Sequence, residues 1–418
     1  MATTTLAMGV NTPASAVVIV GLTHPPPGNV PYTVAEYKNM VGRAGRLGYA
    51  ERGESYVICS LGLDEHRVWS NYVLGKPEDI KSVFLSQTTD RRTQVLRTLS
   101  ALEPGLDGSV DAHVLVSFLE STFGAFQQRQ INPAWAWGRD NIVTILRELV
   151  GHQLIETVEN DKYRLTDLGR FAGEGGVLVD SIIRLVEVLR PLAAAPNSST
   201  LIAAAQVTRE LDEVYLSFNR KAKNTEHRRW PMELAHQQVA PNVGSLIGIG
   251  GTDHLTRVAR AKKAMACLLY ASKTPLSMIE QHLTQHQLGD GIAGAVRATA
   301  DRTRDLIPAV VRVFEFLHPG IAVSDVAERT MVRLELGIPT ELAELGAVLG
   351  AALTRAQYLS LFELGIMTPD QFENGEPLAL VDCLRATENR VLELQEAVQE
   401  GKRQQDEVLV PLLPPPIE

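Results

Sequence analysis

The 418-residue sequence contains little cysteine, few aromatic residues and no long apolar run. Cys59, Cys267 and Cys383 lie far apart, so neither a disulfide framework nor a cysteine metal site is predicted. No apolar stretch approaches the roughly 20 residues that a membrane-spanning helix needs, and no basic segment precedes an apolar one at the start. We expect a soluble, cytoplasmic protein with no secretory signal and no membrane partner.

The sequence also lacks the motifs that hold nucleoside triphosphates and their metal ion. Neither Gly-x-x-x-x-Gly-Lys-Ser/Thr nor Asp-Glu-x-His occurs in it. The first motif cradles phosphates and the second holds Mg²⁺, so we predict that this chain alone binds neither ATP nor Mg²⁺ stably. Residues 248–251 (GIGG) predict a connection between helices, and His282 and His286 lack the further ligands of a metal site.

Basic residues are fewer than acidic ones, 40 against 49, so the formal net charge is −9 and the pI is about 5.7. These values argue against binding of nucleic acid through bulk electrostatics and leave local patches. Two candidates are residues 220–230 (RKAKNTEHRRW) and a group made of Arg257, Arg260, Lys262 and Lys263. Solvated helix faces explain each of them equally well.

The length predicts two to four domains, and 45% hydrophobic with 21% charged residues is typical of a globular chain. Residues 17–20 and 55–59 predict buried strands, with a helix over about 34–46 between them. Helices are predicted over 92–99, 110–118 and 141–150, followed by short strands over 154–158 and 162–166. From residue 173 onward the pattern is helical, including a long helix over 292–317 and a charged helix over 378–408.

Two motifs near the start carry the functional prediction. Residues 37–46 read YKNMVGRAGR, which places two arginines three residues apart, each preceded by glycine or Gly-Ala. Upstream, residues 2–14 read ATTTLAMGVNTPA. In this order they resemble the sixth and fifth motifs of superfamily 2 helicases, in the Ski2-like branch that contains the Hel308-type DNA helicases.

The resemblance implies a multidomain, mostly α protein. It implies the end of a second RecA-like lobe over 1–60, a connector over 61–90 and a winged helix over 91–172. It further implies a helical ratchet bundle over 173–320, a helix-hairpin-helix-like region over 321–382 and a C-terminal helix with a Pro-rich tail over 383–418. The chain would then be the C-terminal portion of an ATP-dependent 3′-to-5′ helicase acting on single-stranded or forked nucleic acid, with DNA favoured.

The resemblance also assigns roles to individual residues. Arg46 is implied as the arginine finger at the ATP γ-phosphate, with Arg43 beside it, and the nearby nucleotide site would include Asn39, Gly42, Gly9 and Asn11. Thr3 and Thr5 would contact a nucleic-acid phosphate. On the long helix, Arg297, Arg302 and Arg304 would face the strand, with Arg302 where the family often has a tryptophan that stacks on a base. Pairing of these arginines with Asp301 or Asp305 is the simpler alternative.

Two further hypotheses for the whole chain stay open. It could be a non-enzymatic nucleic-acid-binding or adaptor module, or one half of a split helicase whose N-terminal half is a separate chain. Both keep the nucleic-acid-binding parts and differ in whether a partner supplies the missing ATP-binding motifs.

Overall fold

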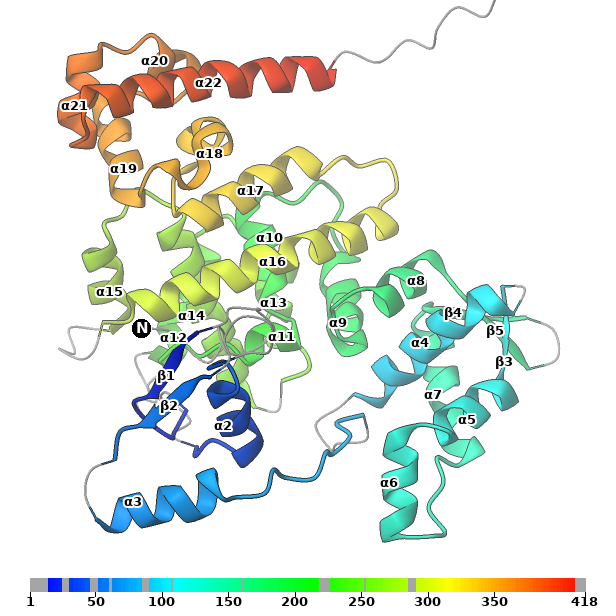
Figure 1. Cartoon of the computed structure of the whole chain (residues 1–418). Coiled ribbons are helices and arrows are strands. Elements are labelled where there is room, and N and C mark those ends of the chain that lie inside the picture. The colour runs from blue at the N-terminus through cyan, green and yellow to red at the C-terminus, as the bar shows by residue number, and fades with distance from the viewer. Residues whose placement is uncertain are drawn as a thin grey trace, which may run out of the picture. The chain divides into compact units, whose positions relative to one another are not determined.

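The computed structural model describes residues 14–24, 30–45, 52–59, 62–84, 90–106, 108–158, 161–217, 226–251, 253–284 and 291–409, with side chains up to residue 402. These residues are mostly helical and include two small sheets (Figure 1). The chain divides into two compact units, Met1–Val83 and Phe84–Glu418. Among the described residues, no helix is both long and apolar enough to cross a membrane.

The first unit is built around a parallel pair of strands, β1 (Ala16–Ile19) and β2 (Glu54–Val57), joined through helix α2 (Val34–Val41). Thr33 and Glu36 form a capping box at the start of α2, so the helix begins where the sequence predicts. It ends at Val41, before the predicted residue 46, because the chain turns at Gly42 and reaches a positive φ of 65° at Gly45.

The prediction that the two strands are buried is wrong. Val18 and Tyr56 are 55% and 53% exposed, whereas Ile19 is buried. Apolar runs of this kind are typical of parallel sheets covered on both faces. Within the described part of this unit the sheet has two strands, so each strand has an edge without a neighbour and most side chains of the pair stay exposed.

Residues 62–83 complete the first unit by packing on α2. They contain α3 (Leu63–Val68) and a π-helical turn, η1 (Trp69–Val73). The Glu78 carboxylate accepts hydrogen bonds from the backbone N–H groups of Val34 and Ala35 at 2.7 and 2.9 Å, and these bonds lower its pKa. Lys38 Nζ donates to the Val73 carbonyl at 2.7 Å. Both ends of α2 are therefore held by this segment.

The second unit begins with a group of helices and a small antiparallel sheet of order β3-β5-β4. Its elements are α4 (Arg91–Leu102), η2 (Glu103–Gly105), β3 (Val110–Asp111), α5 (Ala112–Glu120), α6 (Phe123–Ile131), α7 (Arg139–Gly151), β4 (Ile155–Val158), β5 (Lys162–Leu165) and α8 (Asp167–Glu174). The predicted helices over 92–99 and 141–150 and the two strands are confirmed, whereas the helix predicted from 110 begins only at Ala112 after a short strand. Helix α6 was not predicted.

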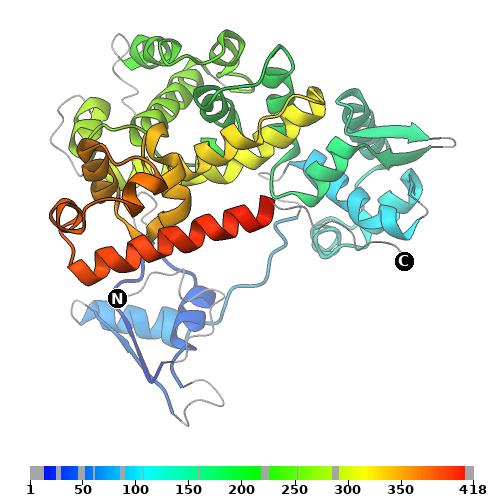
Figure 2. The same ribbon diagram turned by 90° about the horizontal axis from the view of Figure 1, so that it is seen from above.

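Helices α9 to α17 follow and share one apolar core with the preceding elements. They are α9 (Val179–Leu189), α10 (Ser198–Ala205), α11 (Arg209–Asp212), α12 (Glu226–Ala235), α13 (Pro241–Leu246), α14 (His254–Tyr270), α15 (Leu276–Thr284), α16 (Ala293–Leu317) and α17 (Ser324–Leu336). The predicted long helix is confirmed as α16, whose stripe of Val296, Leu306, Val310 and Val313 is buried. Helices α16 and α17 lie side by side (Figures 1 and 2).

The last described elements pack around a second apolar core that includes Tyr358 and Phe372. They are η3 (Thr340–Leu342), α18 (Ala343–Leu349), η4 (Gly350–Ala352), α19 (Arg355–Leu364), α20 (Pro369–Glu373), α21 (Pro377–Leu384) and α22 (Glu388–Leu409). The single helix predicted over 378–408 is wrong. Two helices occupy the segment, because Arg385 adopts a left-handed conformation with φ 49° that ends α21.

Candidate functional site

The turn after α2 carries the predicted nucleotide-site residues that the structure describes. Asn39 is exposed on the last turn of α2, Gly42 is its C-cap, and half-buried Arg43 follows. The Ala14 N–H donates to the Arg43 carbonyl at 3.1 Å, and the Gly45 N–H donates to the Ala14 carbonyl at 3.0 Å. The loop is therefore fixed to the chain that enters β1, and it brings Asn39, Gly42 and Arg43 together within one helical turn.

The second glycine of the YKNMVGRAGR motif has a structural reason. A Cβ added at Gly45 would lie 2.3 Å from the Gly53 nitrogen, and one added at Gly53 would lie 2.1 Å from the Gly45 nitrogen. Two backbone segments approach so closely here that side chains are excluded at both positions. Gly45 is therefore required by this contact between the segment that follows α2 and the segment that precedes β2.

Several predicted site residues lie outside the described part of the chain. They are Thr3, Thr5, Gly9, Asn11 and Arg46. Their assignment to the nucleotide and nucleic-acid sites stays a prediction.

The three arginines predicted to contact nucleic acid do lie on α16, but they do not share one face. At 100° per residue, Arg297 and Arg304 lie about 20° apart, whereas Arg302 lies roughly 140° from Arg297. The middle of the exposed face is formed by Asp301, Asp305 and neighbouring positions. Arg302 and the Arg297–Arg304 pair therefore lie at opposite edges of that face, and a bound strand would cross the helix to touch all three.

The three arginines also differ in their partners. Arg304 bonds Asp305 Oδ1 through Nη2 at 2.8 Å, lies 3.8 Å from a Glu335 carboxylate oxygen, and has a raised pKa through its hydrogen bond to Asp305. Among the described residues neither Arg297 nor Arg302 has an ion pair. Arg297 and Arg302 are therefore the better placed to take an external phosphate.

The proposed basic patch on α14 does not exist as a surface. Arg260, Lys262 and Lys263 are 1%, 3% and 5% exposed, and only Arg257 of the four points to solvent. Arg260 forms two bonds to Asp212 at 2.8 and 2.7 Å, and Lys262 pairs with Glu226 at 2.8 Å. Arg260 and Lys262 are therefore engaged by carboxylates inside the bundle and do not form a surface. The burial of these cations could not be predicted from the sequence of α14, because Asp212 and Glu226 belong to other helices.

Residues 226–230 of the second predicted patch are largely occupied by internal contacts, and residues 220–225 lie outside the described part of the chain. Trp230 is fully buried, so it cannot stack on a base. Arg229 lies over its ring at 4.3 Å and donates to Glu233 at 2.6 Å, and His282 Nε2 lies 2.9 Å from the other Glu233 oxygen. The bonds from Arg229 and His282 oppose the effect of burial and lower the Glu233 pKa overall. Within residues 226–230, Arg228 stays exposed.

The C-terminal helices offer little to a phosphate. A Cβ at Gly346 would meet the side chains of Ile338 and Leu336 at 2.6 and 2.9 Å, so this glycine permits close packing. From residue 363 to 402 carboxylates outnumber cations, and Lys402 pairs with both Asp370 and Glu373. The geometry fits a packing role for this region.

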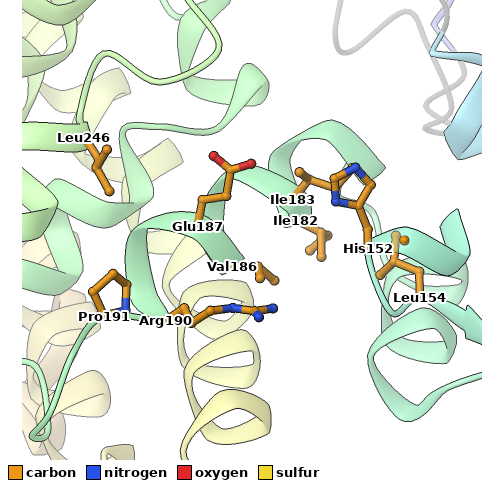
Figure 3. A pocket seen from close by; sticks show the side chains of 10 residues that line it. His152, Leu154, Ile182, Ile183, Val186, Glu187, Arg190, Pro191 and Leu246 are labelled. Carbon is orange, nitrogen blue, oxygen red and sulfur yellow. The ribbon is translucent and has the colours of Figure 1, made fainter. Parts of the chain in front are cut away.

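A pocket of about 420 Å³ lies beside α9 (Figure 3). Its floor is apolar and includes Ile183 and Val186, while Glu187, Arg190 and His152 stand at its sides. Acidic and basic side chains both line this pocket, so its lining favours neither anions nor cations.

No protein-family model matches the chain. It is 28% identical to the ATP-dependent DNA helicase Hel308 of Caldivirga maquilingensis over 386 residues, which cover 87% of this chain and 47% of that helicase. Identity is 33% over 172 residues to the ATP-dependent DNA helicase Hel308 of Pyrobaculum calidifontis, covering 41% of this chain and 23% of that helicase. It is 29% over 238 residues to that of Pyrococcus abyssi, covering 52% and 31%. The chain spans about half or less of the length of these relatives. It is therefore related, over part of their length, to the Hel308-type Ski2-like helicases.

Proposed function

We propose that this chain is the C-terminal portion of an ATP-dependent 3′-to-5′ DNA helicase or translocase that works in the cytoplasm. The observation that carries the proposal is the similarity to ATP-dependent DNA helicases over 87% of the chain. The order of the two motifs before β1 and after α2 supports the same function.

Each part of the chain has a role in this proposal. Residues 1–60 end the second RecA-like lobe, and 61–90 connect it to the rest. Residues 91–172 form a winged helix, supported by the sheet of order β3-β5-β4, in which β4 and β5 follow α7 directly. Residues 173–320 form the ratchet bundle around α16, residues 321–382 the helix-hairpin-helix-like region, and 383–418 the C-terminal helix and tail.

In this proposal the chain contributes arginines to ATP hydrolysis. The residues that bind the ATP phosphates and Mg²⁺ lie outside these 418. Arg46 acts as the finger and Arg43 supports it, because guanidinium groups neutralise the charge that develops on the transferred phosphoryl group. The backbone bonds of Arg43 and Gly45 to Ala14 support the role of Arg43, since a group stabilises a transition state best when its backbone is held in place.

The chain alone should not hydrolyse ATP, with or without single-stranded DNA. With an ATP-binding helicase lobe added as a second chain, hydrolysis should appear, and Arg46→Ala should lower turnover far more than ATP binding. DNA-stimulated hydrolysis by the purified chain alone that persists after contaminating ATPases have been removed would contradict the proposal.

Single-stranded DNA is proposed to contact α16 through Arg297 and Arg302. Each phosphate contact to a single strand contributes about 0.7 to the slope of log K against log salt. Arg297→Ala with Arg302→Ala should therefore weaken binding and flatten the slope by up to about 1.4. Arg304→Ala should change both less, because Arg304 already pairs with Asp305.

Fluorescence anisotropy of a labelled strand across a salt series measures both quantities. Arg329→Ala is a matched control, because Arg329 is an exposed arginine on the neighbouring helix α17 that pairs with Asp325. Circular dichroism verifies folding. Equal affinities and slopes for the folded double variant and the parent chain would remove α16 from the interface.

A non-enzymatic adaptor is the second candidate. One observation favours it: the unit Phe84–Glu418 contains both apolar cores and the proposed DNA contacts on α16, whereas Arg43 belongs to the other unit. A neighbouring reading frame that encodes the phosphate-binding loop would favour the split motor. Binding of single-stranded DNA by the chain, with no ATP hydrolysis after an ATP-binding lobe is added, would favour the adaptor.

A further inference from the structure

A polar pocket of about 610 Å³ lies among the starts of α4, α9 and α14 and the short helix α11. We call it the α9–α14 pocket. Its charged lining includes Arg92, Arg184, Arg209 and Lys263 together with Asp180 and Asp212. The turn at Gly250 closes one side, and the Gly250 carbonyl accepts from Arg184 Nη2 at 3.2 Å.

Two of the three aspartates of this lining, Asp180 and Asp212, are already engaged by arginines. Asp180 lies 3.1 Å from Arg92 Nη2 and 2.5 Å from Arg184 Nη2. Asp212 is bonded by two nitrogens of the buried Arg260 and lies 3.3 Å from Arg184 Nη1. Three arginines thus engage these two carboxylates, and Arg92 also lies 3.4 Å from Asp90 Oδ1. A third carboxylate of the pocket, Asp253, accepts from the Thr256 N–H and caps α14.

Two cations of the pocket have no carboxylate of their own. Lys263 is 5% exposed, and its ammonium donates to the backbone carbonyl of Leu211. An ammonium has three donors, so two are unfilled by the described residues. The Arg209 guanidinium forms neither an ion pair nor a hydrogen bond within the described chain.

A desolvated cation without a counter-charge is costly, and an anion that accepts its hydrogen bonds removes that cost. We propose that the α9–α14 pocket binds a phosphate group, with Arg209 and Lys263 as its direct ligands and Arg92 and Arg184 supporting the positive potential. Phosphate suits the site because several acceptor oxygens can satisfy one ammonium and one guanidinium together. The volume also admits more than phosphate alone, since small-molecule sites typically measure about 300–1,000 Å³.

The ionisation of Lys263 agrees with this assignment. Burial lowers the pKa of its ammonium to about 8, because the charge of Asp212, which is not bonded to Lys263, offsets only part of the desolvation. Burial also lowers the pKa of Lys262, one residue earlier, but Lys262 bonds the Glu226 carboxylate, which opposes that effect. The neighbouring lysines therefore differ in whether the protein itself supplies the anion.

The phosphate group could belong to a free phosphorylated small molecule or to the backbone of a nucleic-acid strand. Isothermal titration of the full chain with inorganic phosphate, adenosine monophosphate and oligothymidylate separates the two sources when ionic strength is held constant with chloride. Binding of phosphate and the mononucleotide indicates a small-molecule site. Binding of the oligonucleotide alone, lost in the pocket variants, indicates a strand site.

Arg209→Ala and Lys263→Met test the two ligands. Each should weaken binding roughly tenfold or more, the usual effect of losing a charge-assisted hydrogen bond. Arg257→Ala should bind like the parent, because Arg257 is an exposed arginine of α14 outside the pocket. Arg209→Ala removes no internal ion pair and should fold normally, so the test does not depend on the folding of Lys263→Met.

Two results would overturn the proposal: no binding of any of the three probes by the parent chain, or unchanged binding by both folded variants. The proposal stands apart from the DNA contact on α16. Loss of strand binding in the variant with Arg297→Ala and Arg302→Ala, with phosphate binding retained, would separate the two sites.

Discussion

Replacing Lys263 by methionine should stabilise the chain at neutral pH and remove a pH dependence that the lysine creates. Lys263 lies on α14 with 5% of its surface exposed. Burial lowers its pKa from an ordinary value of 10.5 to about 8. Methionine keeps the length and apolar character of the stem and carries no charge to desolvate.

The sign follows from proton binding. Between pH 8 and 10.5 the unfolded chain keeps the lysine proton that the folded chain has lost, so the lysine's contribution to stability rises with pH in this window. Below pH 8 both states are protonated, and the folded state carries the full cost of about 3 kcal/mol. The lost bond to the Leu211 carbonyl offsets about 1 kcal/mol of that, or somewhat more because the carbonyl is left buried. Lys263→Met should therefore gain about 1–2 kcal/mol at pH 7.

Urea unfolding followed by circular dichroism at pH 7 and pH 10, in buffers without phosphate, measures the effect. The stability difference between variant and parent should change by about 2.5 kcal/mol between the two values, moving against the variant as pH rises. Subtracting the parent cancels the titration of other groups. A difference that is the same at both pH values would refute the argument that Lys263 is buried as a charged group.

Three other changes test further parts of the structure. Glu226→Gln should destabilise the chain by about 3–5 kcal/mol in urea unfolding, because Lys262 would stay buried without its carboxylate. Adding Lys262→Met should recover most of this loss, and a cost of Glu226→Gln below about 1 kcal/mol would contradict the pairing. Gly45→Ala should speed hydrogen exchange in the strands β1 and β2 and in α2, because the new Cβ would meet Gly53, while Gly21→Ala, with open space around it, should not. Equal exchange in both variants would contradict the close contact of Gly45 with Gly53. Trp230→Ala should lower the free energy of unfolding by about 3–5 kcal/mol. The folded variant should bind single-stranded DNA like the parent chain, since a fully buried ring cannot stack on a base, and a loss of DNA affinity in the folded variant would contradict this.

The helices with a strong apolar period could be predicted from the sequence almost to the residue. The prediction for 292–317 became α16 at Ala293–Leu317, and that for 141–150 became α7 at Arg139–Gly151. In each, the spacing of buried positions along one face depends only on the helical repeat, which is a local property. The single helix predicted over 378–408 failed at one residue, Arg385, because a left-handed turn at an arginine leaves no signal in composition.

Only the residues of the candidate site that belong to recognisable sequence motifs or helical patterns could be predicted. The sequence by itself placed the three arginines on one long helix, and its motif order indicated the relatives that the chain matches. It placed Arg43 inside the helix predicted over 34–46, whereas α2 ends at Val41 and Arg43 follows it. Only the tertiary structure decided which charges are available. Arg260, Lys262 and Lys263 look like a basic surface in sequence, yet long-range packing places Asp212, Glu226 and the Leu211 carbonyl against them. Burial of a charge depends on partners distant in the chain, and no local pattern records them.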